Sequence, residues 1–251
     1  MKKVTISSAT HPGLKRDTNQ DSHKVIIPNN KKILNNKGIL LVLADGMGGN
    51  FGGEIASEMA VDIITNNYYK DNSFRIWKSL RNSFYLANSQ IYNKAQITPK
   101  LKNMGTTLTA IVLIKNKIYV AHVGDSRCYK LNDNHIKQIT EDHSFVMELI
   151  KANMISEEEA IDHPKSNMIT RAIGTDKIVL VDIIKKKIKQ IEHILICCDG
   201  LYREISDEKI HEIVYSHNDP SLACEALVQK AIDNGGNDNI TVVLAKIENK
   251  Y

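Results

Sequence analysis

Short apolar runs rich in β-branched residues alternate with polar turns along most of the chain. Runs of about 4 to 8 such residues are typical of β-strands. Several are joined by turns as short as residues 115–117 and 132–134, which indicates hairpins and antiparallel pairing. The predicted strands cover residues 4–7, 24–27, 39–44, 108–114, 117–123, 127–131, 136–140, 178–184, 194–198 and 240–247.

Two longer segments, residues 53–69 and 74–95, repeat apolar residues at helical spacing, and Trp77 in the second is expected in the core. The order of strands and helices predicts an α+β domain with two central sheets flanked by helices. Three later helices are predicted from a capping box at Ser156 and Glu159, an N-cap at Ser206, and Asp219 followed by Pro220 ahead of a helix that ends at Gly235 and Gly236.

The length of 251 residues suits one domain, because a single hydrophobic core keeps growing up to about this size. Hydrophobic residues make up 42% of the chain, and no linker, low-complexity tract or repeat divides it. We therefore expect one domain over residues 1–251.

The net charge of +4 is mildly basic, and much of the excess lies in residues 29–37 and 183–189. We interpret both stretches as solvated hairpins or strand ends. A nucleic-acid surface combines basic with aromatic residues, and aromatic residues are only 6% of this chain. We therefore expect no nucleic-acid partner, whereas attraction to phosphorylated proteins is compatible with the charge.

The first residues include two lysines but no apolar segment of a secretion signal. No window offers the run of about 18 uncharged apolar residues that a membrane span requires. The four cysteines contain no CxxC pair, so reduced thiols are expected, and the adjacent Cys197 and Cys198 would point to opposite faces of a strand. These features predict a cytoplasmic protein without a membrane span.

Acidic residues beside glycine or asparagine follow predicted strands at several places. A single aspartate there is usually a turn former or a helix cap. Four with the same surroundings favour a metal site, because carboxylates gathered in a partly dry cleft repel one another unless a cation neutralises them. Oxygen ligands select Mg²⁺ or Mn²⁺ over zinc, and no HExxH pairing supports a zinc enzyme. The residues are Asp45, Asp125, Asp199 and Asp238, with Asp21 near the start of the chain.

The glycine-rich stretch DGMGGNFGGE after the strand of Asp45 lacks the lysine of a P-loop and does not fit GxGxxG. Nucleotide binding is therefore weakly supported. Glycine lets the backbone approach an ion closely, so the Gly46 carbonyl is a candidate ligand beside the Asp45 side chain. Gly52 and Gly53 are expected to lead the chain into the following helix.

Eight motifs occur in order from about residue 16 to residue 243: RDTNQDS, LADGMGG, GTTLTA, AHVGDSR, EDHS, TRAIG, ICCDGL and GGNDNITVV. Together they resemble the metal-dependent protein phosphatase family (PPM, type 2C), of the compact bacterial kind. The resemblance implies a four-layer α-β-β-α sandwich with two central, mostly antiparallel sheets. It also implies an enzyme that hydrolyses phosphoserine and phosphothreonine, with a flap at about residues 144–170.

The same resemblance implies a role for each candidate residue. Asp45 would bridge two Mg²⁺ or Mn²⁺ ions, the Gly46 carbonyl would bind one of them, and Asp199 and Asp238 would complete the other. Asp21 would order metal-bound water. A pair of such ions about 3.5–4 Å apart activates a shared water, so the attack on phosphorus needs no protein nucleophile.

Three further residues are implied in the same way. Asp125, together with Asp199, matches the position that holds a third ion in bacterial members. Arg16 matches the arginine that binds the substrate phosphate, and Asn239 is a further neighbour of the site. Among partners, the resemblance implies phosphorylated proteins and an opposing serine/threonine kinase, and it implies a monomer.

Two positions depart from the family pattern. Gln20 stands where many relatives have glutamate, so one carboxylate is missing and weaker metal binding is expected. Met47 stands where animal members often have a histidine proposed as the general acid, and a thioether cannot protonate a leaving group. Metal-bound water or His143 would then supply the proton, although a structural histidine is the commoner case.

Two rival interpretations are weighed against this one. Residues 197–203 spell C-x5-R, the signature of cysteine-dependent tyrosine phosphatases, but no glycine-rich loop separates Cys197 from Arg203. We judge that match coincidental. A regulatory module that binds phosphoproteins without catalysis would have lost metal aspartates, and none is missing here.

Overall fold

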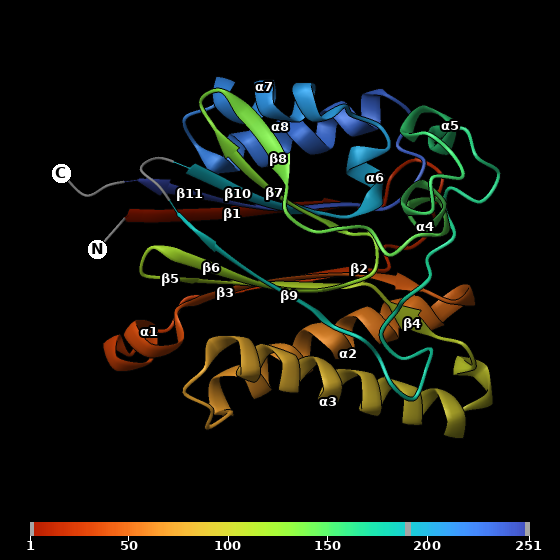
Figure 1. Cartoon of the computed structure of the whole chain (residues 1–251), viewed down its shortest axis with the longest axis horizontal. Helices are drawn as coiled ribbons and strands as arrows, with labels where there is room; N and C mark the ends of the chain where they lie inside the picture. The colour runs from red at the N-terminus through yellow and green to blue at the C-terminus, as the bar shows by residue number, and fades with distance from the viewer. Residues whose placement is uncertain (1–2, 189–191, 249–251) are drawn as a thin grey trace.

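The computed structural model describes residues 3–188 and 192–248. Its strands form two antiparallel sheets that pack face to face, with helices on both outer sides (Figure 1). Helices α7 and α8 cover one sheet, and α2 and α3 cover the other. The predicted four-layer α-β-β-α sandwich is therefore confirmed.

Both sheets are built from strands that lie far apart in the sequence. The first has the order β1-β11-β10-β7-β8, and the second has the order β2-β3-β5-β6-β9, with β4 paired to β3. The first sheet consists of β1 (Lys3–His11), β7 (Arg127–Asn132), β8 (His135–Gln138), β10 (Glu192–Cys197) and β11 (Ile240–Glu248). The second consists of β2 (Asp21–Ile26), β3 (Ile39–Met47), β4 (Gly105–Thr106), β5 (Leu108–Ile114), β6 (Lys117–Val123) and β9 (Asp182–Lys187).

The helices of the described residues differ widely in length. Two long ones, α2 and α3, form one outer layer, whereas short ones lie near the ends of the sandwich (Figure 1). The helices are α1 (Lys31–Lys37), α2 (Gly49–Lys70), α3 (Ile76–Ile97), the 3₁₀ helix η1 (Pro99–Leu101), α4 (Phe145–Lys151), α5 (Glu157–Ile161), α6 (Asp199–Tyr202), α7 (Asp207–Ser216) and α8 (Pro220–Asp233). No helix of the described chain is long and apolar enough to cross a bilayer.

Start signals predicted three of these helices correctly. The Ser156 side chain accepts a hydrogen bond from the Glu159 amide, and the reciprocal bond completes the capping box of α5. Ser206 caps α7, and Asp219 caps α8 with Pro220 in its first turn. Local capping chemistry was therefore sufficient to place these N-termini.

The basic stretch of residues 29–37 is not a hairpin or strand end, as we had expected, but forms α1. Asn30 caps this helix by accepting hydrogen bonds from two backbone amides of the first turn, and Gly38, with φ of 76°, ends it. The second stretch does end a strand. The last three residues of β9, which finishes at Lys187, are exposed lysines, and residue 189 lies outside the described residues.

Strand β9 begins at Asp182, four residues later than predicted. The Asn88 side chain on α3 donates hydrogen bonds to the carbonyls of Asp176 and Lys177, which holds the chain against the helix before it reaches the sheet. Pairing with β6 starts only at Asp182, opposite His122. The apolar run of residues 178–181 is therefore an irregular approach to the strand.

Two other expectations in the helical layer were wrong. Trp77 is only partly buried, with the Arg81 guanidinium 4.8 Å from its ring centre. Helix α2 begins at Gly49, so Gly53 lies inside it. A Cβ on Gly46 would come within 2.2 Å of the Gly53 carbonyl oxygen, so the two glycines let α2 lie against the end of β3.

Buried side chains form three layers, one between the sheets and one under each pair of helices. Along each strand, residues of the layer between the sheets alternate with residues of an outer layer, because successive side chains point to opposite faces. Leu41 and Leu43 of β3 and Ile194 and Ile196 of β10 belong to the inner layer. At one end of the sandwich this layer gives way to polar residues.

We expect Leu41→Ala to lower the free energy of unfolding by about 2–5 kcal/mol, because it leaves a cavity between the sheets. Leu222→Ala, at a position that is 53% exposed, serves as the control and is expected to change stability by less than about 0.5 kcal/mol. Urea unfolding followed by circular dichroism measures both. Equal effects of the two substitutions would contradict the proposed inner layer.

Candidate metal centre

A cavity of about 1040 Å³ opens at the end of the sandwich where α6 begins. Its lining brings together five residues predicted from the sequence: Arg16, Asp45, Asp125, Asp199 and Asp238. Gly46 and Asn239 also line it, as do Gln20 and Met47. Asp21 is not part of the lining but pairs directly with Asp45 in the β2–β3 register. The structure therefore gathers the whole predicted set around one end of the sheets.

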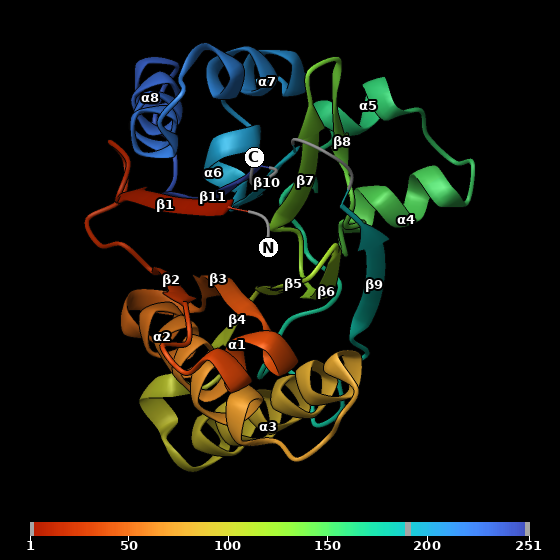
Figure 2. The ribbon, with the colours of Figure 1, turned by 90° about the vertical axis from the view of Figure 1, so that its left-hand side faces the viewer.

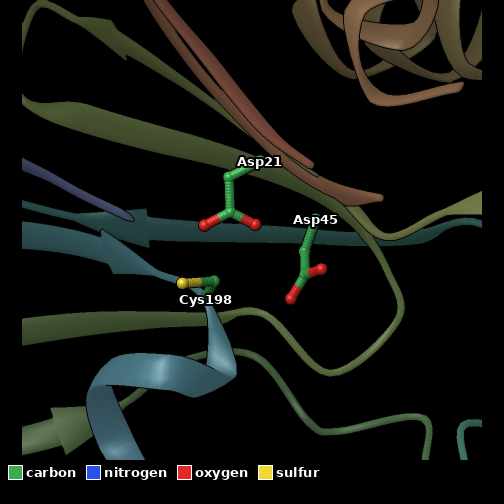
Figure 3. Close-up of side chains that lie close together, drawn as sticks. All are labelled: Asp21, Asp45 and Cys198. Carbon is green, nitrogen blue, oxygen red and sulfur yellow. The ribbon is translucent and has the colours of Figure 1, made fainter. Parts of the chain in front are cut away.

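Asp21 and Asp45 occupy opposite positions on neighbouring strands, which places two carboxylates close together. Like charges directly across a sheet destabilise it unless something neutralises them. Ligand atoms of Asp21, Asp45 and Cys198 lie within 4.8 Å of one another. Figure 3 shows both carboxylates extending toward Cys198, which lies between β10 and α6.

Cys198 is a neighbour of the site to which the sequence analysis gave no role. Ile194 and Ile196 of β10 face the layer between the sheets, so Cys198, two residues later, faces it too. Cys197 packs in the outer layer instead, which confirms that the two cysteines point to opposite faces. The strand period was the signal that places Cys198 on the inner face, whereas its nearness to Asp21 and Asp45 depends on how the sheets pack.

Both thiols are held in the neutral form. Burial raises the pKa of Cys197 above its ordinary value, and burial together with the nearby carboxylates raises the pKa of Cys198. A buried, protonated Cys197 cannot serve as the nucleophile of a C-x5-R phosphatase. The structure therefore contradicts that rival interpretation.

Two threonines of the GTTLTA motif hold the backbone of Asp45. The Thr107 amide and the Thr106 hydroxyl donate to the Asp45 carbonyl, both at 2.8 Å, and the Asp45 amide donates to the Thr107 hydroxyl at 2.9 Å. The sequence analysis used this motif only for the resemblance. The threonines fix the position from which the Asp45 carboxylate enters the cavity.

The two outer carboxylates are each paired with an arginine. Arg16 donates from Nε and Nη2 to the two carboxylate oxygens of Asp238, at 2.9 and 2.6 Å. Arg203 donates from Nε to Asp199 at 2.9 Å. The Arg16 side chain is 57% exposed, so its guanidinium is accessible from the cavity.

Asn239 anchors the loop that carries Arg16. Its side-chain oxygen accepts from the Gln20 amide at 2.8 Å, and its side-chain nitrogen donates to the carbonyls of Pro12 and Thr18, each at 2.9 Å. Residues 12–20 are thereby tied to the start of β11. The structure thus gives Asn239 a positioning role, which its sequence neighbourhood alone did not show.

The electrostatics of the site favour cations. The pKa values of Asp21 and Asp125 are each raised to about 7. Burial is the largest cause, and neighbouring aspartates add to it. Burial and the same neighbours raise the pKa of Asp45 well above its ordinary value. Without a bound metal ion, Asp21, Asp45 and Asp125 therefore hold their protons to a higher pH than an ordinary aspartate does.

The residues present fit a hard divalent ion. Asp21 Oδ1 is buried and has no hydrogen-bond partner among the described residues, while its other oxygen accepts from the Thr241 hydroxyl at 2.6 Å. The remaining donors at the cavity are carboxylates, and the neighbouring Cys198 is a neutral thiol. Such an oxygen-rich set suits Mg²⁺ or Mn²⁺.

His143 lies outside the cavity lining. Its Nδ1 accepts from the Gly124 amide at 3.0 Å, and its Nε2 lies 3.2 Å from an Arg171 nitrogen and 3.4 Å from an Asp182 oxygen. The ring is almost fully buried. These contacts explain His143 as a structural residue, whereas Met47 does line the cavity.

The comparisons with known proteins agree with this geometry. Residues 15–231 match the family described as Protein phosphatase 2C. The chain belongs to this family. The phosphatase is 36% identical to the serine/threonine phosphatase stp of Listeria welshimeri over 211 residues, which cover 82% of this chain and 84% of that protein. It is therefore an enzyme, a protein serine/threonine phosphatase, as the motifs implied.

Solved structures resemble the phosphatase over nearly its whole length. Stp1 from Staphylococcus aureus has a TM-score of 0.88 and 34% identity, with 98% of this chain and 96% of that chain covered. The catalytic domain of the phosphatase PstP in complex with 2 manganese ions has a TM-score of 0.85 and 31% identity, with 99% and 100% covered. These two structures therefore share the layered fold of this chain.

We expect divalent ions to stabilise the phosphatase more at pH 8 than at pH 5. The carboxyl pKa values near 7 of Asp21 and Asp125 exceed the ordinary value of about 3.9, so the metal-free fold loses stability as the pH rises from about 4 to 7. Bound Mn²⁺ replaces those protons and removes the loss. Thermal unfolding in EDTA and in Mn²⁺ should differ by about 5 °C more at pH 8.

The variant Asp21→Asn isolates one of these groups, and Asp62→Asn, whose side chain is 65% exposed, is its control. In EDTA the first variant should show a weaker decrease of the unfolding temperature with pH than the wild type, and the second should not. A Mn²⁺ effect that is equal at both pH values would refute the assignment.

Proposed function

We propose that this phosphatase hydrolyses phosphoserine and phosphothreonine in proteins at a centre of two Mn²⁺ or Mg²⁺ ions held at the end of the sheets. The observation that carries the proposal is the convergence of Asp45, Asp199 and Asp238 on one cavity from three separate strand ends. Support also comes from the related PstP structure, which contains 2 manganese ions. Mn²⁺ and Mg²⁺ both suit the oxygen donors.

Each residue has one task in this proposal. Asp45 would hold both ions, the Gly46 carbonyl would hold one of them, and Asp199 and Asp238 would hold the other. Asp21, which faces Asp45 across the strands, would accept hydrogen bonds from water near the ions. When bound, a pair of divalent ions supplies Lewis acidity and lowers the pKa of a shared water toward neutrality.

Arg16 binds the phosphate of the substrate. A guanidinium offers a planar pair of donors that matches two oxygens of a phosphate monoester, as it now matches both oxygens of Asp238. Its loop is fixed by Asn239, so the donors are held at the mouth of the cavity. No histidine lines the cavity among the described residues, so water near the ions would donate the proton to the leaving serine or threonine.

The chemistry also indicates the partners. A phosphatase of this kind acts on products of a serine/threonine kinase, so an opposing kinase in the same cell compartment, the cytoplasm, is part of the proposal. The residues assigned to the site gather around one cavity of this chain, and a monomer is part of the proposal. The cavity is open enough for a phosphorylated side chain on a protein surface.

We expect Asp45→Asn to lower kcat/KM by about 10³-fold or more, because the residue that contacts both ions is lost. Phosphate release from a phosphothreonine peptide in Mn²⁺ measures the effect. Cys197→Ala is the matched control. This buried thiol at the end of β10 packs in the outer layer, away from the proposed site, so its loss should leave most of the activity. A folded wild-type protein that is inactive in both Mn²⁺ and Mg²⁺ would favour the non-catalytic binding module.

We expect Arg16→Ala to lower kcat/KM for the same peptide by about 10- to 100-fold, the range for losing a charged bidentate hydrogen bond. Mn²⁺ binding, measured by calorimetry, should change little, and Arg16→Lys should be intermediate. A fall in Mn²⁺ affinity as large as the fall in activity would show that Arg16 acts through Asp238 and not on the phosphate.

A further inference from the structure

Arg203 connects the proposed metal site to the flap. It follows α6 directly, and its Nε donates to Asp199 at 2.9 Å, while its Nη2 lies 3.8 Å from an Asp125 oxygen. Both carboxylates are largely buried, and the guanidinium is the cation that contacts the two of them. It therefore neutralises the same pair that the family resemblance implies as the position of a third ion.

The other side of the guanidinium holds the flap, residues 144–170. Its Nη1 donates to the Asn167 side-chain oxygen, and its Nη2 donates to the Ser166 carbonyl at 3.3 Å. The two ends of the flap are joined at its base, where Ser144 pairs with Ile169 in an antiparallel bridge. Figure 2 shows α4 and α5 of the flap outside the sandwich, beside β8 and β9. Arg203 is thus a direct link between the turn of the flap at Ser166 and Asn167 and the carboxylates of the cavity.

The other side chains around Asp125 do not replace Arg203 as its cationic partner. The Tyr202 hydroxyl lies 3.5 Å from the Asp125 carboxylate, and the Arg127 guanidinium stacks 3.7 Å from the Tyr202 ring centre. Arg127 is itself paired with Asp142 at 2.8 Å, so its charge is already matched. Asp125 is held in place by this frame, and Arg203 is its one ion-pair partner among the described residues.

We propose that Arg203 is a built-in counter-cation for Asp125 and Asp199, so that a third divalent ion binds there only by displacing it, which releases Ser166 and Asn167. The proposal rests on the two-ion centre of the proposed function. A guanidinium and a divalent ion cannot share one pair of carboxylates at contact distance, because their charges repel. All three guanidinium nitrogens are engaged, so moving it for the ion also breaks the flap contacts.

The first test counts Mn²⁺ ions by calorimetry and by the electron paramagnetic resonance signal of free Mn²⁺. The wild type should bind two ions tightly and a third weakly. Arg203→Gln should bind the third at least about tenfold more tightly, because the competing charge is gone. Lys209→Gln removes an exposed positive charge elsewhere in the same half of the chain and should match the wild type.

The second test follows amide hydrogen exchange in peptides that cover residues 160–170. In the wild type, exchange should stay slow with two equivalents of Mn²⁺ and rise at the higher concentrations where the third ion binds. Asn167→Ala should exchange faster than the wild type but keep a weak third site, because the guanidinium remains. These two measurements decide the proposal even if Arg203→Gln does not fold.

The outcomes separate this proposal from the function on which it rests. If the wild type binds two ions and releases phosphate, but Arg203→Gln binds the third no better than Lys209→Gln, Arg203 is not the counter-cation. Flap exchange that stays constant while the third ion binds would also overturn the link. If the wild type binds no Mn²⁺ at all, the proposed two-ion centre itself is wrong.

Discussion

Repulsion between carboxylates at one end of the sandwich is the constraint on which the site depends. The β2–β3 register pairs Asp21 with Asp45, and it cannot slip by one residue without moving Leu41 and Leu43 out of the layer between the sheets. The hydrophobic effect therefore forces the two charges together. The fold tolerates them because protons, hydrogen-bond donors or metal ions can balance the charge.

The strand period explains how far the sequence could locate these residues. Leu41, Leu43 and Asp45 alternate on one face of β3, and Ile194, Ile196 and Cys198 do the same on β10 and just beyond it. The pattern of a single strand thus predicts that the polar residue at its end lies on the same face as the inner-layer residues before it. It does not predict which strands meet, because the partner is set by sheet order and not by local pattern.

Long-range contacts are the part that the sequence could not supply. The pairing of Arg16 with Asp238 joins residues more than 200 positions apart, and the motifs show both residues without showing that they touch. The strands and the capped helices were predictable, since their signals are local. Helix α1 was missed, although Asn30 and Gly38 mark its ends, because its lysine-rich sequence buries no residue and shows no apolar face. The start of α2 was missed because its first residues are rich in glycine, which has a low helix propensity.

The distribution of arginines shows why the inner carboxylates call for metal ions. The outer residues Asp238 and Asp199 each have a guanidinium partner, whereas no ion pair of the described chain reaches Asp21 or Asp45. Those two lie where the sheets converge, with Cys198 opposite them, and a long guanidinium would need space that close packing denies. A small, doubly charged ion brings more charge in less volume. The fold thus places the arginines beside the outer carboxylates, where their longer side chains fit.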